Sequence, residues 1–333
     1  MKPLAVVLCI LALILGASPQ TFAQNAPTGS IAGTVKDNSA AVIPAATITI
    51  ANDSGVVQTG TTDEKGEYRI DGLAPGSYTV TVQGPGMKDF TAKDVVVTAD
   101  QIARVDATMT PSAVSTSINV EGQTVTQVET ESAQIGGTLT SQEVVSLGLN
   151  GRNFTQLIAL APGVSNQTGQ DEALVGVKGS VNYSVNGGRV EYNTYDVDGG
   201  DVLNAGINGS KSTLIVYPSI DAIAELQVLT SNYGAMYGRS ASGTILATTK
   251  NGGNGFHGDG YFFARNNIFN DRNYFDETRH APTYAKYDPG FTIGGPLYIP
   301  DHYNTAKDKT FFFWSEEYRH DKEPVELIRR CPA

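Results

Sequence analysis

The sequence predicts a mainly β chain in three successive parts: a β-sandwich, a small mixed α/β region, and strands suited to a membrane barrel. Three observations predict this class. Of the 333 residues 36 are glycine, above the average of about 7%. Tyr, Thr, Val, Ser and Asn dominate, which favours strands and turns. Short runs alternate apolar with polar residues between turn signals.

Composition excludes several classes of protein. Charged residues make up 17% and apolar residues 40%, with a net charge of -11, so the chain is neither a disordered polyampholyte nor a helical membrane protein. The acidic balance, without a basic cluster, argues against nucleic-acid binding.

Residues 1–23 have the pattern of a cleaved signal peptide. Lys2 precedes an apolar run from Leu4 to Leu15, and Thr21-Phe22-Ala23 offers small residues before a cleavage point. The run is shorter than the roughly 20 residues that span a bilayer. The protein is therefore expected to be exported.

Residues 24–112 form the predicted β-sandwich. Ile48 and Ile50 share one face of an alternating run, and further runs follow turns at Asp63–Gly66 and Pro75–Gly76. About seven short strands in roughly eighty residues is typical of a sandwich.

Two motifs of this unit resemble the carboxypeptidase regulatory-like domain, a transthyretin-like sandwich. They are Thr62-Asp63-Glu64-Lys65-Gly66-Glu67-Tyr68 and Leu73-Ala74-Pro75-Gly76-Ser77-Tyr78. The resemblance concerns the regulatory sandwich and not the peptidase. His320 and Glu323 have the short spacing of a zinc pair, but no histidine follows them, and a catalytic zinc needs three protein ligands. We therefore predict no metal, no cofactor, no catalytic residue and no enzyme.

Residues 113–130 are expected to form a linker, and residues 131–250 a mixed α/β domain. A helix is predicted from Ser141, its N-cap, and a second over Asn153–Leu160. Strands are predicted over Ser180–Asn186, Val190–Val197 and Ile223–Leu229, with Asn186-Gly187 as a hairpin turn between the first two.

This region resembles the plug domain of TonB-dependent outer-membrane receptors. The motifs are Asn150-Gly151-Arg152-Asn153-Phe154, Leu160-Ala161-Pro162-Gly163-Val164, Ser184-Val185-Asn186-Gly187-Gly188-Arg189, Tyr195-Asp196-Val197-Asp198-Gly199 and Tyr233-Gly234-Ala235-Met236-Tyr237-Gly238-Arg239. A regulatory-like sandwich before such a plug is the arrangement of the Oar-like subgroup. The alternating oxygens of Asp196, Asp198 and Asp201 leave two interpretations open, a calcium loop or a plain acidic turn, and the missing acidic twelfth position favours the turn.

Residues 251–333 are predicted to begin a transmembrane β-barrel. Phe256, Gly258, Gly260, Phe262 and Ala264 would face lipid, while His257, Asp259, Tyr261 and Arg265 would face the lumen. Further strands are expected over Phe291–Ile299 and Lys309–Arg319. A soluble sheet is the alternative. The smallest closed barrels need about eight strands, so we expect the chain to be the N-terminal part, or a truncated product, of a longer receptor.

The resemblances together imply a TonB-dependent receptor of the outer membrane that moves a large or scarce solute. Its partners would be a TonB-type energy-coupling protein, outer-membrane lipid and an unknown ligand, with Ile118–Val128 either adding a strand to TonB or serving as a spacer. The alternative is a secreted or periplasmic binding protein that uses the sandwich for recognition. Location discriminates the two: membrane association favours the receptor, and release favours the binding protein.

Overall fold

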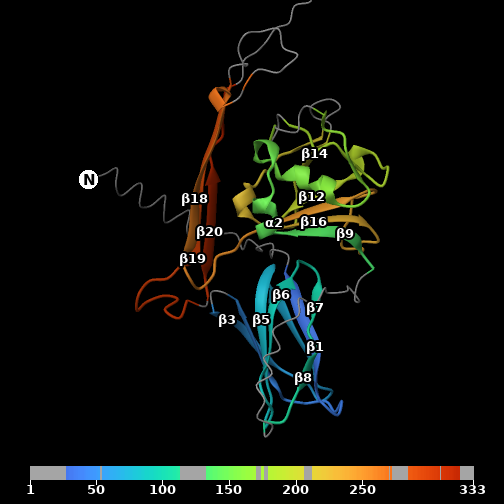
Figure 1. Ribbon diagram of the computed structural model, residues 1–333, viewed down its shortest axis with the longest axis vertical. Coiled ribbons are helices and arrows are strands. Elements are labelled where there is room, and N and C mark those ends of the chain that lie inside the picture. The colour runs from blue at the N-terminus through green and yellow to red at the C-terminus, as the bar shows by residue number, and fades with distance from the viewer. Residues whose placement is uncertain are drawn as a thin grey trace, which may run out of the picture.

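A computed structural model describes residues 28–52, 55–112, 133–169, 174–175, 179–205, 212–269, 271, 284–307 and 309–322. These residues form three bodies, which we call the sandwich (β1 to β8), the α/β unit (β9 to β17) and the C-terminal sheet (β18 to β21). In Figure 1 the sandwich lies below the α/β unit, and the C-terminal sheet stands beside the α/β unit. The signal peptide and linker predictions fall outside the described residues.

The sandwich consists of two four-stranded sheets. One has the order β4-β1-β7, with β8 also paired to β1, and the other has the order β3-β2-β5-β6. The strands are β1 Gly29–Asp37, β2 Thr47–Asn52, β3 Gly55–Thr61, β4 Glu67–Leu73, β5 Gly76–Gln83, β6 Phe90–Val97, β7 Ile102–Arg104 and β8 Ala107–Met109.

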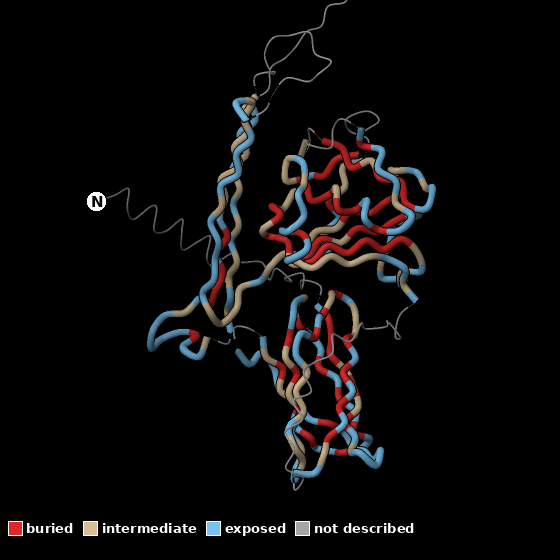
Figure 2. Tube along the Cα trace, in the orientation of Figure 1, coloured by how far each residue is buried: buried red, intermediate tan, exposed pale blue. Residues whose placement is uncertain are grey.

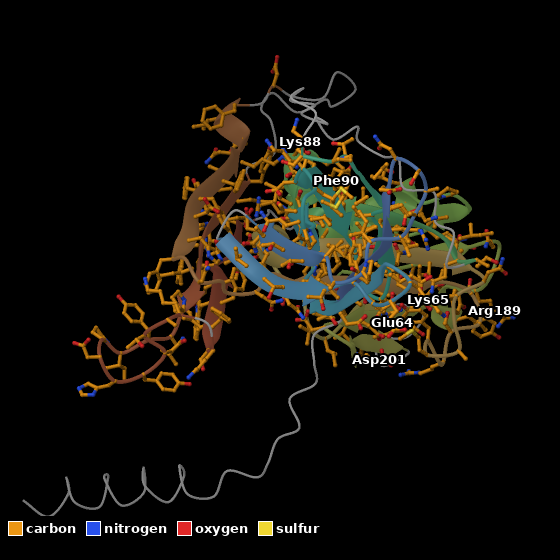
Figure 3. The ribbon with its side chains drawn as sticks, turned by 90° about the horizontal axis from the view of Figure 1, so that it is seen from below. Glu64, Lys65, Lys88, Phe90, Arg189 and Asp201 are labelled. Carbon is orange, nitrogen blue, oxygen red and sulfur yellow. The ribbon has the colours of Figure 1, made fainter. Side chains whose placement is uncertain are left out.

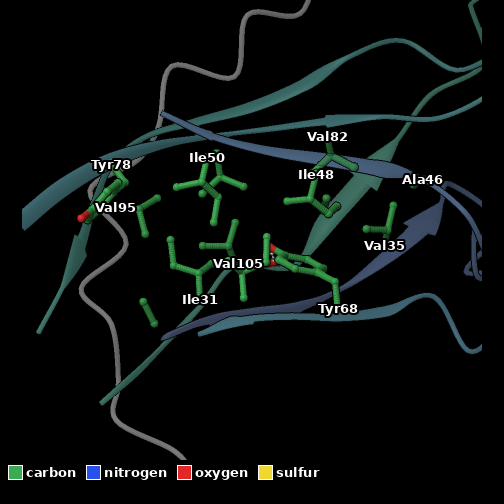
Figure 4. Close-up of a cluster of buried hydrophobic side chains, with 14 of the residues drawn as sticks. Ile31, Val35, Ala46, Ile48, Ile50, Tyr68, Tyr78, Val82, Val95 and Val105 are labelled. Atoms are coloured by element: carbon green, nitrogen blue, oxygen red, sulfur yellow. Dashed lines mark hydrogen bonds between the residues drawn. The ribbon is translucent and has the colours of Figure 1, made fainter. Parts of the chain in front are cut away.

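The sandwich core comes from the inward-facing positions of these strands, as strand alternation requires. Ile48 and Ile50 of β2 are fully buried, and they lie with Ile31, Val82 and Val105 in the cluster of Figure 4. The prediction that Ile48 and Ile50 share a face is confirmed. Strand β3 was not predicted. It lies at a sheet edge, and nearly all of its residues are exposed.

The α/β unit is built on a five-stranded sheet of order β13-β12-β17-β16-β9, in which only β12 and β17 run parallel. Its strands are β9 Ile135–Thr140, β10 Val164–Asn166, β11 Tyr183–Val185, β12 Thr194–Val197, β13 Gly200–Asp201, β14 Leu203–Ala205, β15 Ser212–Leu214, β16 Ile223–Ser231 and β17 Thr244–Thr249. Its helices are α2 Ser141–Ser146 and the 3-10 helices η1 Asn150–Arg152, η2 Phe154–Leu160, η5 Val190–Tyr192 and η6 Ile220–Ala222.

Two local predictions in the α/β unit need correction. The helix at residue 141 exists, but its N-cap is Thr140, whose N–H donates to the Glu143 carboxylate at 2.8 Å. The predicted strand Val190–Val197 is wrong in its first half, which is the 3-10 helix η5. The predicted hairpin is also wrong, because strand β11, which ends just before the turn at Asn186, pairs with β10 and not with β12.

The C-terminal sheet joins β18 His257–Asn266, β19 Ala285–Pro296, β20 Phe311–Glu317 and β21 His320–Lys322, and Asn267–Phe269 forms the 3-10 helix η7. The order is β18-β19-β20, with β21 also on β19. Figure 2 shows this sheet as mostly intermediate or exposed, whereas the other two bodies have buried interiors. No helix in the described ranges is long and apolar enough to cross a membrane.

The two faces of the C-terminal sheet differ as the alternation predicts. Phe262 and Trp314 are 65% and 59% exposed on the outer face. Tyr261 and Arg265 contact the α/β unit from the opposite face. Tyr261 and Arg265 therefore lie on one face of β18 and Phe262 on the other, as alternation predicts, and the assignment of these faces to lumen and lipid stays a prediction.

Truncation of a core side chain tests the sandwich. We expect Ile48→Ala to lower the free energy of unfolding of the sandwich by about 2–5 kcal/mol, because it leaves a cavity in a closed core. Val56→Ala on the neighbouring strand β3 is the control, and because Val56 is exposed its effect stays within about 0.5 kcal/mol. Urea titration followed by hydrogen exchange of β2 and β5 peptides measures both. Equal effects of the two variants would contradict the assigned core.

Candidate functional site

The candidate site is a buried ionic contact between the α/β unit and the C-terminal sheet. We call it the Arg152 junction and define it as Arg152, Asp221, Tyr261, Phe263, Glu317 and Arg319. Arg152 ends the 3-10 helix η1, where Gly151 and Arg152 both have positive φ, 66° and 50°. This turn, which glycine permits, directs the Arg152 side chain toward β18 and β20, where only 12% of it is exposed.

Two guanidinium groups and two carboxylates balance one another in the junction. Arg152 Nη2 donates to Asp221, and Arg152 Nε donates to Glu317 Oε2 at 3.1 Å. Arg319 Nε donates to the other Glu317 oxygen at 2.6 Å. Arg319 Nη2 also donates to the backbone carbonyl of Arg152 at 3.2 Å. Glu317 is 5% exposed, so its charge is compensated by these donors and not by water.

Aromatic rings of β18 complete the surroundings of Arg152. Its guanidinium lies 4.2 Å from the Phe263 ring centre and 4.8 Å from that of Tyr261, within cation–π range. The Tyr261 hydroxyl donates to Glu317 at 3.1 Å. The Tyr261 ring lies over Gly290 of β19, where an added Cβ would collide with it.

The charge of Arg152 is secured by its partners. Burial alone would lower the pKa of Arg152, but the nearby Glu317 and Asp221 carboxylates raise it above its ordinary value. The group therefore stays protonated.

The segment that carries Arg152 is fixed to the core of the α/β unit. The Asn153 side chain accepts from the Thr155 N–H at 2.9 Å and from the Tyr217 hydroxyl. The buried Phe154 ring packs on Tyr217 with centroids 4.9 Å apart. These contacts leave η1 little freedom to move without η2.

A cavity of about 470 Å³ adjoins the junction. Tyr217, Ser219, Ser315, Glu317 and Arg319 are among its lining residues, and the Ser219 and Ser315 hydroxyls are 2.9 Å apart. The cavity thus lies between the α/β unit and strand β20. Its charged groups are already bonded to one another, an arrangement that holds two bodies together.

The acidic loop considered for calcium is bonded to protein donors. Asp198 accepts from the N–H and the hydroxyl of Thr249, each at 2.8 Å. Asp201 accepts from the Leu203 N–H at 3.0 Å and pairs with Arg239. Within the described residues, no group of three or more His, Cys, Asp or Glu side chains is placed to hold a metal.

Of the two residues considered as a zinc pair, His320 and Glu323, the structure describes only His320. His320 lies in β21 and its ring stacks on Tyr287, with ring centres 6.4 Å apart. Glu323 lies outside the described residues.

Comparison with known proteins assigns both ends of the chain. Residues 30–110 match the carboxypeptidase regulatory-like domain, and residues 248–333 match an outer membrane β-barrel domain. The chain is also 27% identical over 309 residues to the TonB-dependent transporter Oar of Myxococcus xanthus, covering 88% of this chain. In these domain matches and in this relative, the chain is similar to the Oar-like TonB-dependent receptors. It spans 26% of the length of that relative.

Two solved structures are similar to part of this chain. The siderophore receptor PirA from Acinetobacter baumannii is 20% identical with a TM-score of 0.42, covering 58% of this chain and 25% of PirA. The outer membrane transporter YddB from Escherichia coli is 18% identical with a TM-score of 0.39, covering 49% of this chain and 24% of YddB.

These findings settle three predictions. The chain is mainly β, as predicted. Its location is the outer membrane, as its barrel domain and its transporter relative indicate. The curated relative is a transporter and not an enzyme, so the prediction that this chain is not an enzyme is confirmed.

The Arg152 junction was only partly visible in the sequence. Arg152 belongs to the motif Asn150–Phe154, and Tyr261 was placed on the lumen face. Asp221 and Glu317 were not identified as its partners. One signal for Glu317 was available in the sequence. Glu317 lies two positions after Ser315 in an aromatic strand, so alternation places both polar side chains on the same face.

Removal of the Arg152 charge tests the junction. We expect Arg152→Met to lower the free energy of opening of the junction by about 3–5 kcal/mol, because Glu317 and Asp221 lose a buried partner. Hydrogen exchange of peptides from η2 and β20 in the full chain measures the opening. The control is Arg69→Met, whose pair with Asp71 is exposed and is worth less than about 1 kcal/mol. An Arg152 effect no larger than the Arg69 effect would refute the junction.

Proposed function

We propose that this chain supplies the plug-bearing N-terminal part of an energy-coupled outer-membrane transporter. In this proposal, a signal peptide (1–23) precedes the sandwich (24–112), a linker (113–130), the plug (131–250) and the first barrel strands (251–333). The domain matches at the two ends and the α/β unit between them support this order.

The observation that carries the proposal is the side on which the α/β unit contacts the C-terminal sheet. Tyr261, Phe263 and Glu317 meet Arg152 on one face of this sheet. Phe262 and Trp314 are exposed on the other face. A barrel strand needs an apolar face toward lipid and may be polar toward the lumen. This arrangement supports the proposal that the α/β unit lies on the lumen side, where a plug would block passage.

Transport requires the plug to shift, and the Arg152 junction opposes that shift. Separating a buried ion pair costs several kcal/mol, so a plug held this way needs an external source of work. We propose that a TonB-type protein supplies it by pairing with the segment Ile118–Val128 through strand addition. That segment lies outside the described residues.

The transported solute is proposed to be large or scarce, as the resemblance to TonB-dependent receptors implies. The alternative, a released binding protein, is disfavoured by the match to an outer membrane β-barrel domain and by the exposed aromatic face of the C-terminal sheet.

Loss of the plug should open the barrel. We expect deletion of residues 131–250 in the receptor expressed in its host to make the cells sensitive to vancomycin, a solute that an intact outer membrane excludes. Deletion of residues 24–112 is the control and should leave resistance unchanged. Unchanged resistance after the first deletion, with the receptor present in the outer membrane, would overturn the plug assignment.

Binding of the energy-coupling partner tests the linker. Replacement of residues 118–128 by a Gly-Ser segment of equal length should abolish capture of the full chain by the immobilised C-terminal domain of the host TonB protein. In the control, residues 113–117 are replaced by a Gly-Ser segment as long as the one in the first variant, and residues 118–128 are kept. This control should not abolish capture. Retained binding in the first variant would show that the segment is only a spacer.

A further inference from the structure

The five-stranded sheet of the α/β unit packs one face into the hydrophobic core, and its other face, here called the polar face, carries Glu225, Gln227 and Thr248 beside Leu229 and Leu246. Leu226, Val228 and Ile245 on the first face belong to the hydrophobic core. Glu225 and Gln227 alternate with them on β16 and therefore lie on the opposite face. They are nevertheless only 3% and 2% exposed. Buried polar side chains on a sheet face need partners.

The sandwich covers this polar face with the loop between β6 and β7, residues 98–101. The Ala99 N–H donates to Glu225 Oε2 at 3.1 Å, and Ala99 is 3% exposed. In the reverse direction, the Tyr237 hydroxyl of the α/β unit donates to Asp100 Oδ2 at 3.1 Å. Each body thus provides one donor and one carboxylate to the contact.

The contact also encloses polar space. A cavity of about 250 Å³ is lined by Asp100 of the sandwich and by Asp196, Gln227, Tyr237 and Thr248 of the α/β unit, among others. Among the described residues, Gln227 Oε1 and Nε2 and Glu225 Oε1 have no hydrogen-bond partner. An interface that contains polar atoms without hydrogen bonds and a cavity beside them is easier to separate than a packed apolar core.

We propose that the polar face of this sheet is the docking surface for the β6–β7 loop of the sandwich, that Glu225 is its anchor, and that a proton on Glu225 strengthens the docking. This assigns the sandwich a role as a releasable cover on the α/β unit. It does not depend on which solute the receptor transports.

The proton dependence follows from the surroundings of Glu225. Burial raises the pKa of Glu225 to about 7, the Ala99 hydrogen bond acts in the opposite direction, and the neighbouring Asp100 raises it further. Either protonation state can accept the Ala99 N–H, since a carboxylic acid keeps its carbonyl oxygen. Protonation therefore removes the buried charge without breaking the bond.

The other ionisable groups near this contact do not offset the charge of Glu225. Tyr237 comes from the loop after β16, and Asp196 from β12. Burial and then Asp201 raise the pKa of Asp196, whereas Arg239 lowers it. Arg239 is itself paired with Asp201. On β9, the strand partner of Glu225 is the uncharged Thr140, which is bonded to Glu143.

The sign of the pH effect is fixed by comparing the docked and separated states. Once separated, Glu225 meets water and has its ordinary pKa of 4.5, against about 7 when docked. Docking is therefore strongest below the separated value and weakens as the pH rises through the docked value. Between pH 6 and pH 8.5, the docking constant should fall about tenfold.

The distance between the two bodies tests the proposal in the full chain. Spin labels go on Lys65→Cys of the sandwich and Arg189→Cys of the α/β unit, both exposed and labelled in Figure 3, with Cys9 and Cys331 replaced by Ser. We expect a narrow distance distribution at pH 6 and, at pH 8.5, about tenfold less docked relative to separated protein. Protection of the Ala99 amide, corrected for its intrinsic exchange rate, should fall in parallel.

Three variants make the outcome decisive. Glu225→Gln keeps an acceptor but cannot ionise, so docking should persist at both pH values. Glu225→Ala should be separated at both. Glu143→Gln, which neutralises another carboxylate of the same unit, should keep the normal pH response. If Glu225→Ala does not fold, by circular dichroism, Glu225→Gln still decides. A pH-independent distance in the chain with Glu225 intact, or a pH response retained by Glu225→Gln, would overturn the proposal.

Discussion

A buried guanidinium between two bodies sets the arrangement of this structure. Arg152 is removed from water by β18 and β20, and its charge is tolerable only because Glu317 and Asp221 lie beside it. Glu317 is in turn shared with Arg319. The position of the α/β unit and the position of the C-terminal sheet therefore depend on each other. Neither can shift alone without exposing an unpaired charge to a poorly solvated space.

Apolar contacts close the sandwich and the α/β unit, whereas the contacts described above between the bodies are polar. The sandwich and the α/β unit each close around a hydrophobic cluster of their own. The contacts between the bodies described above include ion pairs, hydrogen bonds and cation–π contacts, and two of these contact regions adjoin cavities. Dispersion and hydrophobic burial are hard to undo in part, because interiors are closely packed. The strength of polar contacts between the bodies depends on the charge of their groups. The chain therefore combines closely packed bodies with contacts that a change in protonation can weaken.

Local sequence signals predicted the parts better than the joints. The period of two along strands predicted that Ile48 and Ile50 are buried and that β18 has two different faces. Such alternation can be recognised within a few residues. Strand β3 was missed because, as an exposed edge, it carries little alternation. The 3-10 helix η5 was read as strand because a three-residue helix has no period of its own. The partners of Arg152 lie 69 and 165 positions away along the chain, and no local pattern in one sequence specifies such pairs.

The Tyr261 ring over Gly290 limits which mutations this chain can accept. Gly290 has no charge and no hydrogen-bonding side chain, so it would pass for a freely variable position in a strand. Even a methyl group there would push the Tyr261 ring away, and that ring is a wall of the space that holds Arg152. Substitution of Gly290 is thus constrained by Arg152, which belongs to the α/β unit and not to the C-terminal sheet. Gly290, although uncharged, therefore tolerates as few substitutions as the buried Arg152 whose surroundings it supports.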